Sequence, residues 1–293
     1  MFTNVRAFFT ERQVLEVDCP ALSRASSIDL HIDPITAGDG FLHTSPEYGM
    51  KRLLAQGLGD IYQLSHVFRK EELGPLHNPE FTLIEWYRVG FSFEEMIEET
   101  CDLIQLFCPA KAIEKISYRE AFCKFAKINA TTASPEELCR AAEMHGLCPS
   151  PEWDRDTLLQ LLMGFVIEPQ LKGENLFVIY HYPATQAALA KTKRVDNIEV
   201  AERFEVYYEG IELANGYHEL QDAKLQKERL AKALEERKAH NKELLPIDTA
   251  FLRALEHGIP DCCGVAVGFD RLMLLKTEAI SLSEILPLGT SCY

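Results

Sequence analysis

The stretch FRKEELGPLHNPEFTLIEWY, residues 68–87, is the most informative part of this chain. Its second half, residues 81–87, is rich in aromatic and β-branched side chains and comes shortly after a proline, which predicts a β-strand. Because side chains alternate across a strand, one face is expected to carry Phe81, Leu83, Glu85 and Tyr87. Residues 68–72 are predicted to be the partner strand of a hairpin, joined through a loop that contains Gly74 and Pro75.

The predicted hairpin gathers groups that suit a nucleotide and a small cation. Arg69 keeps its charge and offers a planar fork that binds a phosphate group at two points. The ends of the strand face, Phe81 and Tyr87, lie roughly 20 Å apart at about 3.3 Å per residue. A base could therefore stack at one end while a cationic substrate reaches the Glu85 carboxylate near the other. The alternative is an amphipathic edge hairpin with ordinary salt bridges.

Length and composition restrict the class of protein. The 293 residues suffice for one large domain or for one domain with an insertion. Apolar residues make up 47% and charged residues 26%, as in a soluble globular protein. The formal net charge of −15 opposes extended contact with a nucleic-acid backbone and suits an enzyme that attracts a cationic substrate. No apolar run reaches the roughly 18 residues of a membrane span, and the first residues lack the apolar core of a signal peptide.

The nine cysteines are scattered along the chain, and no two of them are spaced as a CxxC pair. An odd count without such pairs argues against both a zinc site and a disulfide framework. Reduced thiols are typical of the cytoplasm, so we predict a cytoplasmic protein.

The remaining sequence carries both helix and strand signals. Helices are predicted at residues 2–13, 45–57, 93–107, 134–145, 155–166 and 222–240, and from Asp270 onward. Strands are predicted at residues 14–17, 41–44, 176–180, 202–214 and 264–267. We therefore expect an α+β fold, with one domain over residues 1–293, a mainly antiparallel sheet flanked by helices, and a helical insertion at about residues 110–175.

The segment TSPEY, residues 44–48, reads as the start of a helix. Ser45 is the predicted N-cap and Pro46 the first helical residue, and the helix dipole favours the charge of Glu47. Lys51 follows one turn later. A helix start of this kind can also be no more than a well-capped terminus, and that alternative stays open.

Residues 203–216, RFEVYYEGIELANG, read as two antiparallel strands joined by a two-residue turn at Glu209-Gly210. The opposed pairs in this register are Tyr207 with Glu212 and Glu205 with Ala214. Glu205 and Glu212 are then diagonal neighbours within about 8 Å, where two carboxylates repel each other unless a cation bridges them. Carboxylate oxygens and nucleotide phosphates together form the usual Mg²⁺ site. The alternative is a solvent-facing pair whose repulsion is screened.

Residues 264–271, GVAVGFDR, combine a strand of small residues with a helix start that Asp270 is predicted to cap. Glycines and small side chains let a ligand approach the backbone closely, and Arg271 is placed to reach a phosphate. A plain strand-to-helix connection is the alternative. Neither a GxGxxG nor a GxxxxGK[ST] motif is present, so a nucleotide site would have to be of another kind.

Taken together, these segments resemble the catalytic domain of class II aminoacyl-tRNA synthetases. Residues 68–71 with 77–81 are similar to motif 2 of the lysyl-tRNA synthetases, residues 264–271 to motif 3, and the first helix and strand with Pro20 to motif 1. The chain is more similar still to a paralogous family, the elongation factor P–(R)-β-lysine ligases, over nearly its whole length. This similarity rests on TSPEY (44–48), MKRLL (50–54), HNPEFT (77–82), EWYR (85–88), RDTLLQLL (155–162) and AERFEVYYEGIELANGYHEL (201–220).

The resemblance implies a role for each matching residue. The catalytic residues that it implies, which stabilise the phosphates, are Arg69 and Arg271. The ATP-binding residues that it implies are Arg69, Lys70, Glu71, His77, Asn78, Phe81, Glu212, Leu213, Gly268 and Arg271. The implied residues for the amino-acid substrate are Ser45, Pro46, Glu47, Glu85, Tyr87, Asn215, Glu219 and Ala266, and those for Mg²⁺ are Glu205 and Glu212.

The activity that the resemblance implies depends on ATP. The carboxylate of (R)-β-lysine or lysine attacks the α-phosphate of ATP, which gives an aminoacyl-adenylate and pyrophosphate. A lysine ε-amino group of elongation factor P then takes the acyl group as an amide. A homodimer built around motif 1 is also implied, and neither a membrane nor tRNA is an expected partner. Two other hypotheses remain open: a truncated lysyl-tRNA synthetase that acylates tRNA, and a non-catalytic sensor of amino acid and nucleotide.

Departures from the synthetase pattern affect these expectations. Ala266 stands where the synthetases usually have glycine, and its methyl group is expected to reshape the floor of the pocket in favour of β-lysine. Lys70 replaces the asparagine expected after Arg69. The resemblance begins at the catalytic domain, so no N-terminal anticodon-binding domain is expected. The chain also starts later than expected for the family, which suggests an absent leading segment or a different start.

Overall fold

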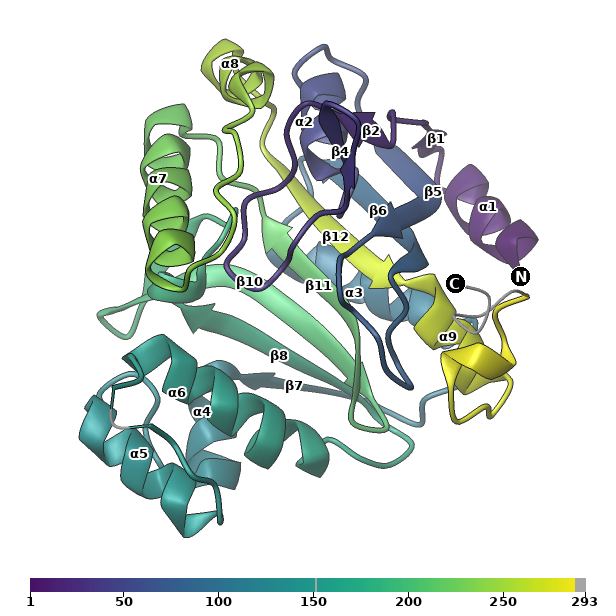
Figure 1. Cartoon of the computed structure of the whole chain (residues 1–293). Coiled ribbons are helices and arrows are strands. Elements are labelled where there is room, and N and C mark those ends of the chain that lie inside the picture. The colour runs from purple at the N-terminus through teal and green to yellow at the C-terminus, as the bar shows by residue number, and fades with distance from the viewer. Residues whose placement is uncertain (151, 288–293) are drawn as a thin grey trace. The chain divides into compact units, whose positions relative to one another are not determined.

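The computed structural model describes residues 1–150 and 152–287, and contacts divide the chain into two compact units. Unit 1 consists of residues 1–96 and the described part of 219–293, and unit 2 consists of residues 97–218 (Figure 1). Antiparallel strand pairs predominate in both units, and helices accompany each set of strands. The predicted α+β class is therefore confirmed, whereas the single domain over residues 1–293 stays a prediction.

The strands of unit 1 that carry the site lie in the order β1 (Leu15–Glu16), β5 (Ile61–Phe68), β6 (Glu80–Val89) and β12 (Cys262–Gly268). β1 pairs with β5 in parallel, and the other two pairs are antiparallel. Across this sheet Glu85 lies opposite Gln63 on one side and Ala266 on the other. A small second sheet contains β2 (Leu22–Ser23), β4 (Gly40–Leu42) and β3 (Thr36–Ala37).

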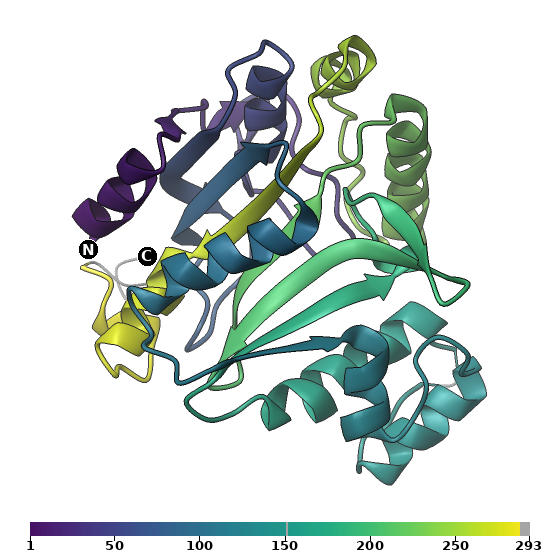
Figure 2. The same cartoon turned by 180° about the vertical axis from the view of Figure 1, so that it is seen from behind.

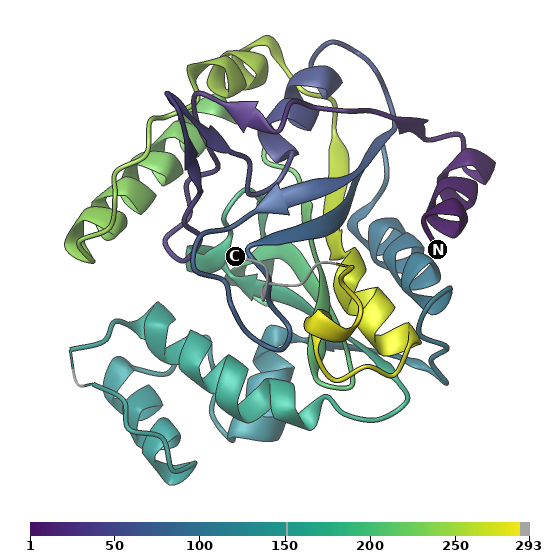
Figure 3. The same cartoon turned by 45° about the vertical axis from the view of Figure 1, so that its right-hand side comes forward.

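Helices complete unit 1. They are α1 (Phe2–Glu11), α2 (Glu47–Leu54), α7 (Ala223–Ala239), α8 (Thr249–His257), α9 (Phe269–Lys276) and the 3-10 turn η5 (Leu282–Glu284), while α3 (Phe93–Gln105) contains the boundary between the units. α1 packs beside the sheet because the Phe9 ring stacks on Tyr62 at 4.2 Å and meets Trp86 edge-on at 5.3 Å (Figure 2). α9 continues directly from the end of β12 (Figure 3).

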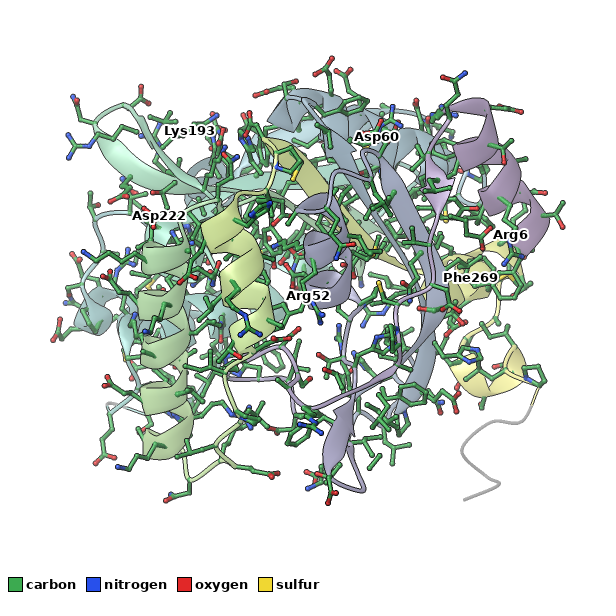
Figure 4. All side chains as sticks on the ribbon, turned by 90° about the horizontal axis from the view of Figure 1, so that it is seen from above. Arg6, Arg52, Asp60, Lys193, Asp222 and Phe269 are labelled. Atoms are coloured by element: carbon green, nitrogen blue, oxygen red, sulfur yellow. The ribbon has the colours of Figure 1, made fainter. Side chains whose placement is uncertain are left out.

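Polar side chains begin several of these helices. Asp222, at the start of α7 in Figure 4, accepts hydrogen bonds from the amides of Lys224 and Leu225 at 2.9 and 3.0 Å. Asp248 caps α8 in the same way. These caps satisfy amide groups that have no partner within the helix. Because Asp222 is the N-cap, the charged helix predicted at residues 222–240 begins one residue later, at Ala223.

Unit 2 is built on strands in the order β11 (Ile211–His218), β10 (Ile198–Tyr208), β8 (Leu176–Pro183) and β7 (Ile113–Ser117), with β9 (Thr192–Val195) paired to β10. Its helical segments are α4 (Tyr118–Ala121), α5 (Pro135–Met144) and α6 (Arg155–Leu162), the π-helical turns η1 (Phe122–Ala126) and η2 (Met163–Ile167), and the 3-10 turns η3 (Glu168–Gln170) and η4 (Ala184–Gln186). A core cluster joins α4, α5 and α6 to β8 and β10.

Three details of the predicted elements are wrong. The partner strand of β6 is residues 61–68 rather than 68–72, because Glu71 has a φ of 63° and the chain leaves the sheet at Arg69. Helix α2 begins at Glu47, with Pro46 rather than Ser45 at the N-cap. Asp270 does not cap α9: Gly268 holds that position, and the Asp270 carboxylate accepts from the Thr82 amide instead.

Some elements were not predicted. The strand β7 lies within the segment expected to be a helical insertion, and β9, α8 and the strands β2 and β3 carry no strong sequence signal, whereas β4 overlaps the strand predicted at residues 41–44. The eight described cysteines are all free thiols, and Cys292 lies outside the described residues. None of the helices within the described ranges has the length and apolar character that a membrane crossing requires.

Candidate active site

A buried carboxylate, Glu85, lies near the middle of β6 and is 3% exposed. Its Oε2 accepts a hydrogen bond from the Ser45 hydroxyl at 2.6 Å, and its Oε1 accepts one from the Tyr87 hydroxyl at 2.7 Å. The Ser45 oxygen also accepts from the Glu47 amide at 3.0 Å, so the start of α2 is tied to β6. Ser45, Glu85 and Tyr87 therefore meet as the sequence predicts.

A second group of charges surrounds Lys51, one turn after Glu47 on α2. The Lys51 ammonium lies 2.7 Å from Glu47 Oε1 and 2.5 Å from Glu219 Oε2. The side chains of Lys51 and Glu219 are each 1% exposed. We name the set Glu47, Lys51, Glu85, Tyr87 and Glu219 the acidic pocket; it contains three carboxylates and one ammonium group.

Burial decides the protonation of the acidic pocket. Burial, together with the Glu47 charge, raises the pKa of Glu85 to about 8, although Ser45, Tyr87 and Lys51 act in the opposite direction. Burial and the charges of all three carboxylates hold the pKa of Tyr87 well above its usual range. Burial alone would lower the pKa of Lys51, but the charges of Glu219 and Glu47 outweigh it and raise that pKa. In the unliganded pocket Glu85 therefore holds a proton at neutral pH, and a bound ammonium group would favour its ionised form.

Gly264 on β12 lies directly against this pocket, opposite Tyr87. A Cβ atom at this position would clash with the Tyr87 ring and lie 2.5 Å from Glu219 Oε1. Only a hydrogen atom fits there, because both side chains are buried and held by other contacts. This close approach explains the glycine at the start of the GVAVGFDR segment.

Cationic and aromatic groups lie at the other end of the same face of β6. The Arg69 guanidinium carbon is 5.0 Å from the centre of the Phe81 ring, and its Nη1 is 3.5 Å from Glu72 Oε1. The Arg69 Nε atom is buried and has no hydrogen-bond partner among the described residues. Arg69 thus retains a donor for a ligand, although it starts the loop rather than lying on a strand.

The loop after β5 also reaches α9. Arg271 Nη2 lies 2.8 Å from His77 Nε2, and burial together with the Arg271 charge lowers the pKa of His77, which favours the neutral ring as acceptor. Asn78 Nδ2 donates to the Glu80 carbonyl at 2.6 Å, and Gly268 ends β12 just before Arg271. Two predicted ATP-binding residues stand apart from this group: the side chains of Lys70 and Glu71 are 57% and 82% exposed and pair with each other at 3.7 Å.

Unit 2 holds the predicted metal ligands. The two-residue turn at Glu209-Gly210 is confirmed by φ angles of 53° and 75°, and Tyr207 lies opposite Glu212 as expected. The expected pairing of Glu205 with Ala214 is wrong: a β-bulge places Asn215 opposite Glu205. The extra residue, Leu213, leaves Glu205, Tyr207, Glu212 and Asn215 on one face.

The Glu205 carboxylate is already bound by three donors within unit 2. Arg203 Nη2 donates to Oε1 at 2.6 Å, Tyr182 donates to Oε2 at 2.5 Å, and the Tyr207 hydroxyl donates to the same oxygen. A carboxylate has about four acceptor positions, so roughly one remains for a metal ion. No group of three or more histidine, cysteine, aspartate or glutamate residues suited to a metal occurs within the described ranges. The side-chain oxygen of Asn215 is buried and has no hydrogen-bond partner among the described residues.

Several residues of these clusters were not predicted. Lys51, Gly264, Arg203 and Tyr182 bind or confine the predicted residues. Two of them had a local signal: Lys51 is spaced i+4 from Glu47, and Arg203 is two residues from Glu205 on the same strand face. Tyr182 has none, because it contacts Glu205 only through the pairing of β8 with β10.

The chain is similar to known proteins along nearly its whole length. The family model described as tRNA synthetases class II (D, K and N) matches residues 1–291. The chain is 45% identical to the elongation factor P–(R)-β-lysine ligase of Edwardsiella ictaluri over 98% of this chain and 91% of that protein. It is 43% identical to the protein of that name from Haemophilus influenzae over 98% and 91%, and 44% identical to that from Haemophilus ducreyi over 99% and 91%.

Proposed function

Because the chain belongs to the class II tRNA synthetase family of the D, K and N type, and within it to the elongation factor P–(R)-β-lysine ligases, we propose that it activates a diamino acid with ATP and transfers the acyl group to a protein lysine. The observation that carries this proposal is the surplus of carboxylates around Glu85, on the strand face that also holds Phe81, against which Arg69 packs. One end of this face suits ammonium groups and the other suits a nucleotide.

In the first step the substrate carboxylate attacks the α-phosphate of ATP and pyrophosphate leaves. Arg69 and Arg271 neutralise the charge that develops on the phosphate oxygens, and the protein contributes mainly positioning and electrostatic stabilisation. Phe81 stacks on the adenine, with Lys70, Glu71, His77, Asn78, Leu213 and Gly268 as further ATP contacts. The exposed Lys70 and Glu71 reach ATP only if their side chains turn from their mutual pair.

In the second step the neutral ε-amine of the acceptor lysine attacks the carbonyl carbon of the adenylate. The C–O bond to AMP breaks, an amide forms, and the amine loses one proton. No side chain of the chain becomes covalently linked to the substrate. The proposed acceptor is elongation factor P, after the names of the relatives.

The amino-acid site is proposed to be the acidic pocket together with Ser45, Pro46, Asn215 and Ala266. Two ammonium groups of (R)-β-lysine or lysine match its surplus carboxylates. Ala266, opposite Glu85 in the sheet, adds a methyl group to the floor of this site and is proposed to favour the β-amino acid.

The metal site is proposed to involve Glu212 and Glu205. Both carboxylates would hold Mg²⁺, and Glu205 would contribute about one acceptor position, because its three hydrogen bonds occupy the others. Mg²⁺ keeps several water or phosphate ligands, so two carboxylates suffice to hold it. When bound, it neutralises phosphate charge.

We further propose a homodimer that works in the cytoplasm, for which the free thiols of the described cysteines are suited.

The products of the second step test this proposal. The purified chain is incubated with ATP, Mg²⁺ and either (R)-β-lysine or lysine, together with either elongation factor P or total tRNA. We expect a mass increase of elongation factor P by one β-lysyl group and no acylated tRNA. Substantial acylation of tRNA instead would identify a truncated lysyl-tRNA synthetase and contradict the proposal.

A further inference from the structure

Lys51 places an ammonium group inside a pocket that is proposed to receive ammonium groups. Its Nζ lies 2.7 Å from Glu47 and 2.5 Å from Glu219, and its side chain is 1% exposed. It also lies 5.9 Å from the centre of the Phe251 ring on α8. A buried lysine with two carboxylate partners is fixed in place, so it competes with the substrate for the same acceptors. Its presence requires an explanation.

The number of charged groups in the acidic pocket explains the presence of Lys51. When a ligand is bound and Glu47, Glu85 and Glu219 are all ionised, the Lys51 ammonium balances one of their three charges, so two negative charges of this set are left for the ligand. Glu85 bears a large share of this surplus, because the groups that donate to it, Ser45 and Tyr87, are neutral hydroxyls. If Lys51 were absent, repulsion and desolvation would oppose the ionisation of all three carboxylates more strongly, and the two ammonium groups of a ligand would be too few to balance them.

We propose that Lys51 is a built-in counter-ion that sets the surplus charge of the acidic pocket at two, and that it thereby selects acids with two ammonium groups over acids with one. This inference rests on the proposed function and adds a specificity-determining residue to it. Lys51 acts as a positioning residue, since its ion pairs hold the Glu47 and Glu219 carboxylates in place without contacting the reacting atoms. An acid with one ammonium group leaves Glu85 protonated or one carboxylate without a cation, so it lacks one of the two charge-assisted contacts and binds more weakly.

The first test removes the charge and retains the shape. Lys51→Met keeps most of the side-chain volume, and Lys232→Met is the matched control on α7, where the lysine side chain is 62% exposed. Pyrophosphate exchange is measured with lysine, (R)-β-lysine and 2-aminohexanoic acid, which has only one ammonium group. We expect Lys51→Met to lower kcat/KM for the diamino acids about 100-fold or more, mainly through KM, and Lys232→Met to have no effect.

The second test restores the balance. The double variant Lys51→Met/Glu47→Gln removes one positive and one negative charge, so the surplus returns to two. We expect kcat/KM of the double variant for the diamino acids to be about 10-fold higher than that of Lys51→Met. Two substitutions of contacting residues would then partly cancel each other, which is a non-additive result. A purely structural role of Lys51 predicts the reverse, because the double variant loses a second buried partner.

Each result of these two tests either supports or contradicts the proposed role of Lys51. The inference is contradicted if kcat/KM of Lys51→Met for the diamino acids stays within about threefold of the wild-type value. It is also contradicted if the double variant is no more active than the single one. If Lys51→Met does not fold by circular dichroism, the double variant decides: a folded, active double variant supports the charge balance, and an unfolded one contradicts it. A wild-type chain without exchange for any diamino acid contradicts the proposed function itself, whereas wild-type exchange with unaffected variants contradicts only the role of Lys51.

Discussion

At the scale of single residues, burial of the Glu85 carboxylate links substrate binding to pH. Its pKa is raised to about 8, first by burial and then by the Glu47 charge, while Ser45, Tyr87 and Lys51 oppose the shift. Below that pH the unliganded carboxyl group holds a proton, whereas an ammonium ligand requires the ionised form. Binding of a diamino acid at neutral pH should therefore release a proton from Glu85.

The apparent KM for a diamino acid is accordingly expected to rise by about tenfold per pH unit below 8 and to level off above it. Pyrophosphate exchange from pH 6 to 9 measures this dependence. Glu85→Gln is the control, because the amide does not titrate: its KM should be high and nearly independent of pH. A wild-type KM that stays constant across the range would show that Glu85 does not bind the ammonium group.

Gly264 gives a second prediction at this scale. In Gly264→Ala the new methyl group overlaps the Tyr87 ring and the Glu219 carboxylate, so both must move. We expect a loss of about 1–3 kcal/mol in the free energy of unfolding and a fall in exchange activity of about 100-fold or more. Gly164→Ala is the matched control, since a Cβ atom there meets nothing within 4 Å. Equal effects of the two substitutions on activity would contradict the proposed close packing.

At the scale of elements, α7 is fixed by an arginine that is fully buried. Arg237 donates to the carbonyls of Glu243, Asp29 and Ile32 at 2.9, 2.7 and 3.2 Å, and to the Asp33 carboxylate at 2.8 Å. These bonds join the end of the helix to the loop before β3. Removing the guanidinium leaves several buried acceptors without a donor.

Arg237→Met is therefore expected to lower the free energy of unfolding by about 3 kcal/mol. Urea denaturation measures the change, and Lys232→Met on the same helix should change stability by less than about 0.5 kcal/mol, since its ion pair with Glu236 is exposed. A loss below about 1 kcal/mol for Arg237→Met would mean that water replaces the guanidinium in the folded protein.

Long elements with clear periodicity or caps were the predictable part of the fold. The strand β6 and the helix α7 were predicted within a few residues because apolar alternation and a capping aspartate mark them. The start of the loop at Arg69 was not, because the positive φ of Glu71 leaves no trace in a run of charged residues. The bulge at Leu213 was missed for a similar reason: an extra residue changes the pairing of strands without changing their propensity.

The candidate site was predictable to the extent that its residues lie within one element or one turn. Glu85 and Tyr87 share a strand face, so their hydrogen bond follows from alternation alone. The contact of Lys51 with Glu219 depends on where the chain returns after 167 intervening residues, and no local pattern contains that information. Charge balance in the pocket, which needs all four partners, therefore became visible only in three dimensions.

At the scale of the whole molecule, unit 1 alone contains the acidic pocket, Arg69, Phe81 and Arg271, while unit 2 contains Glu205 and Glu212. The formal net charge of −15 agrees with a preference for cationic substrates over nucleic acid. On this proposal unit 1 provides both the acceptors for the ammonium groups of the amino acid and the cationic groups that bind the phosphates of ATP.

Exchange of labelled pyrophosphate into ATP tests this claim most directly, because it requires only the first step and no acceptor. With the full chain, ATP and Mg²⁺, we predict exchange that depends on (R)-β-lysine or lysine, is absent with 2-aminohexanoic acid, and is lost in Arg69→Ala. A folded wild-type chain that shows no exchange with either diamino acid, or an Arg69→Ala variant that retains nearly normal exchange, would contradict the account.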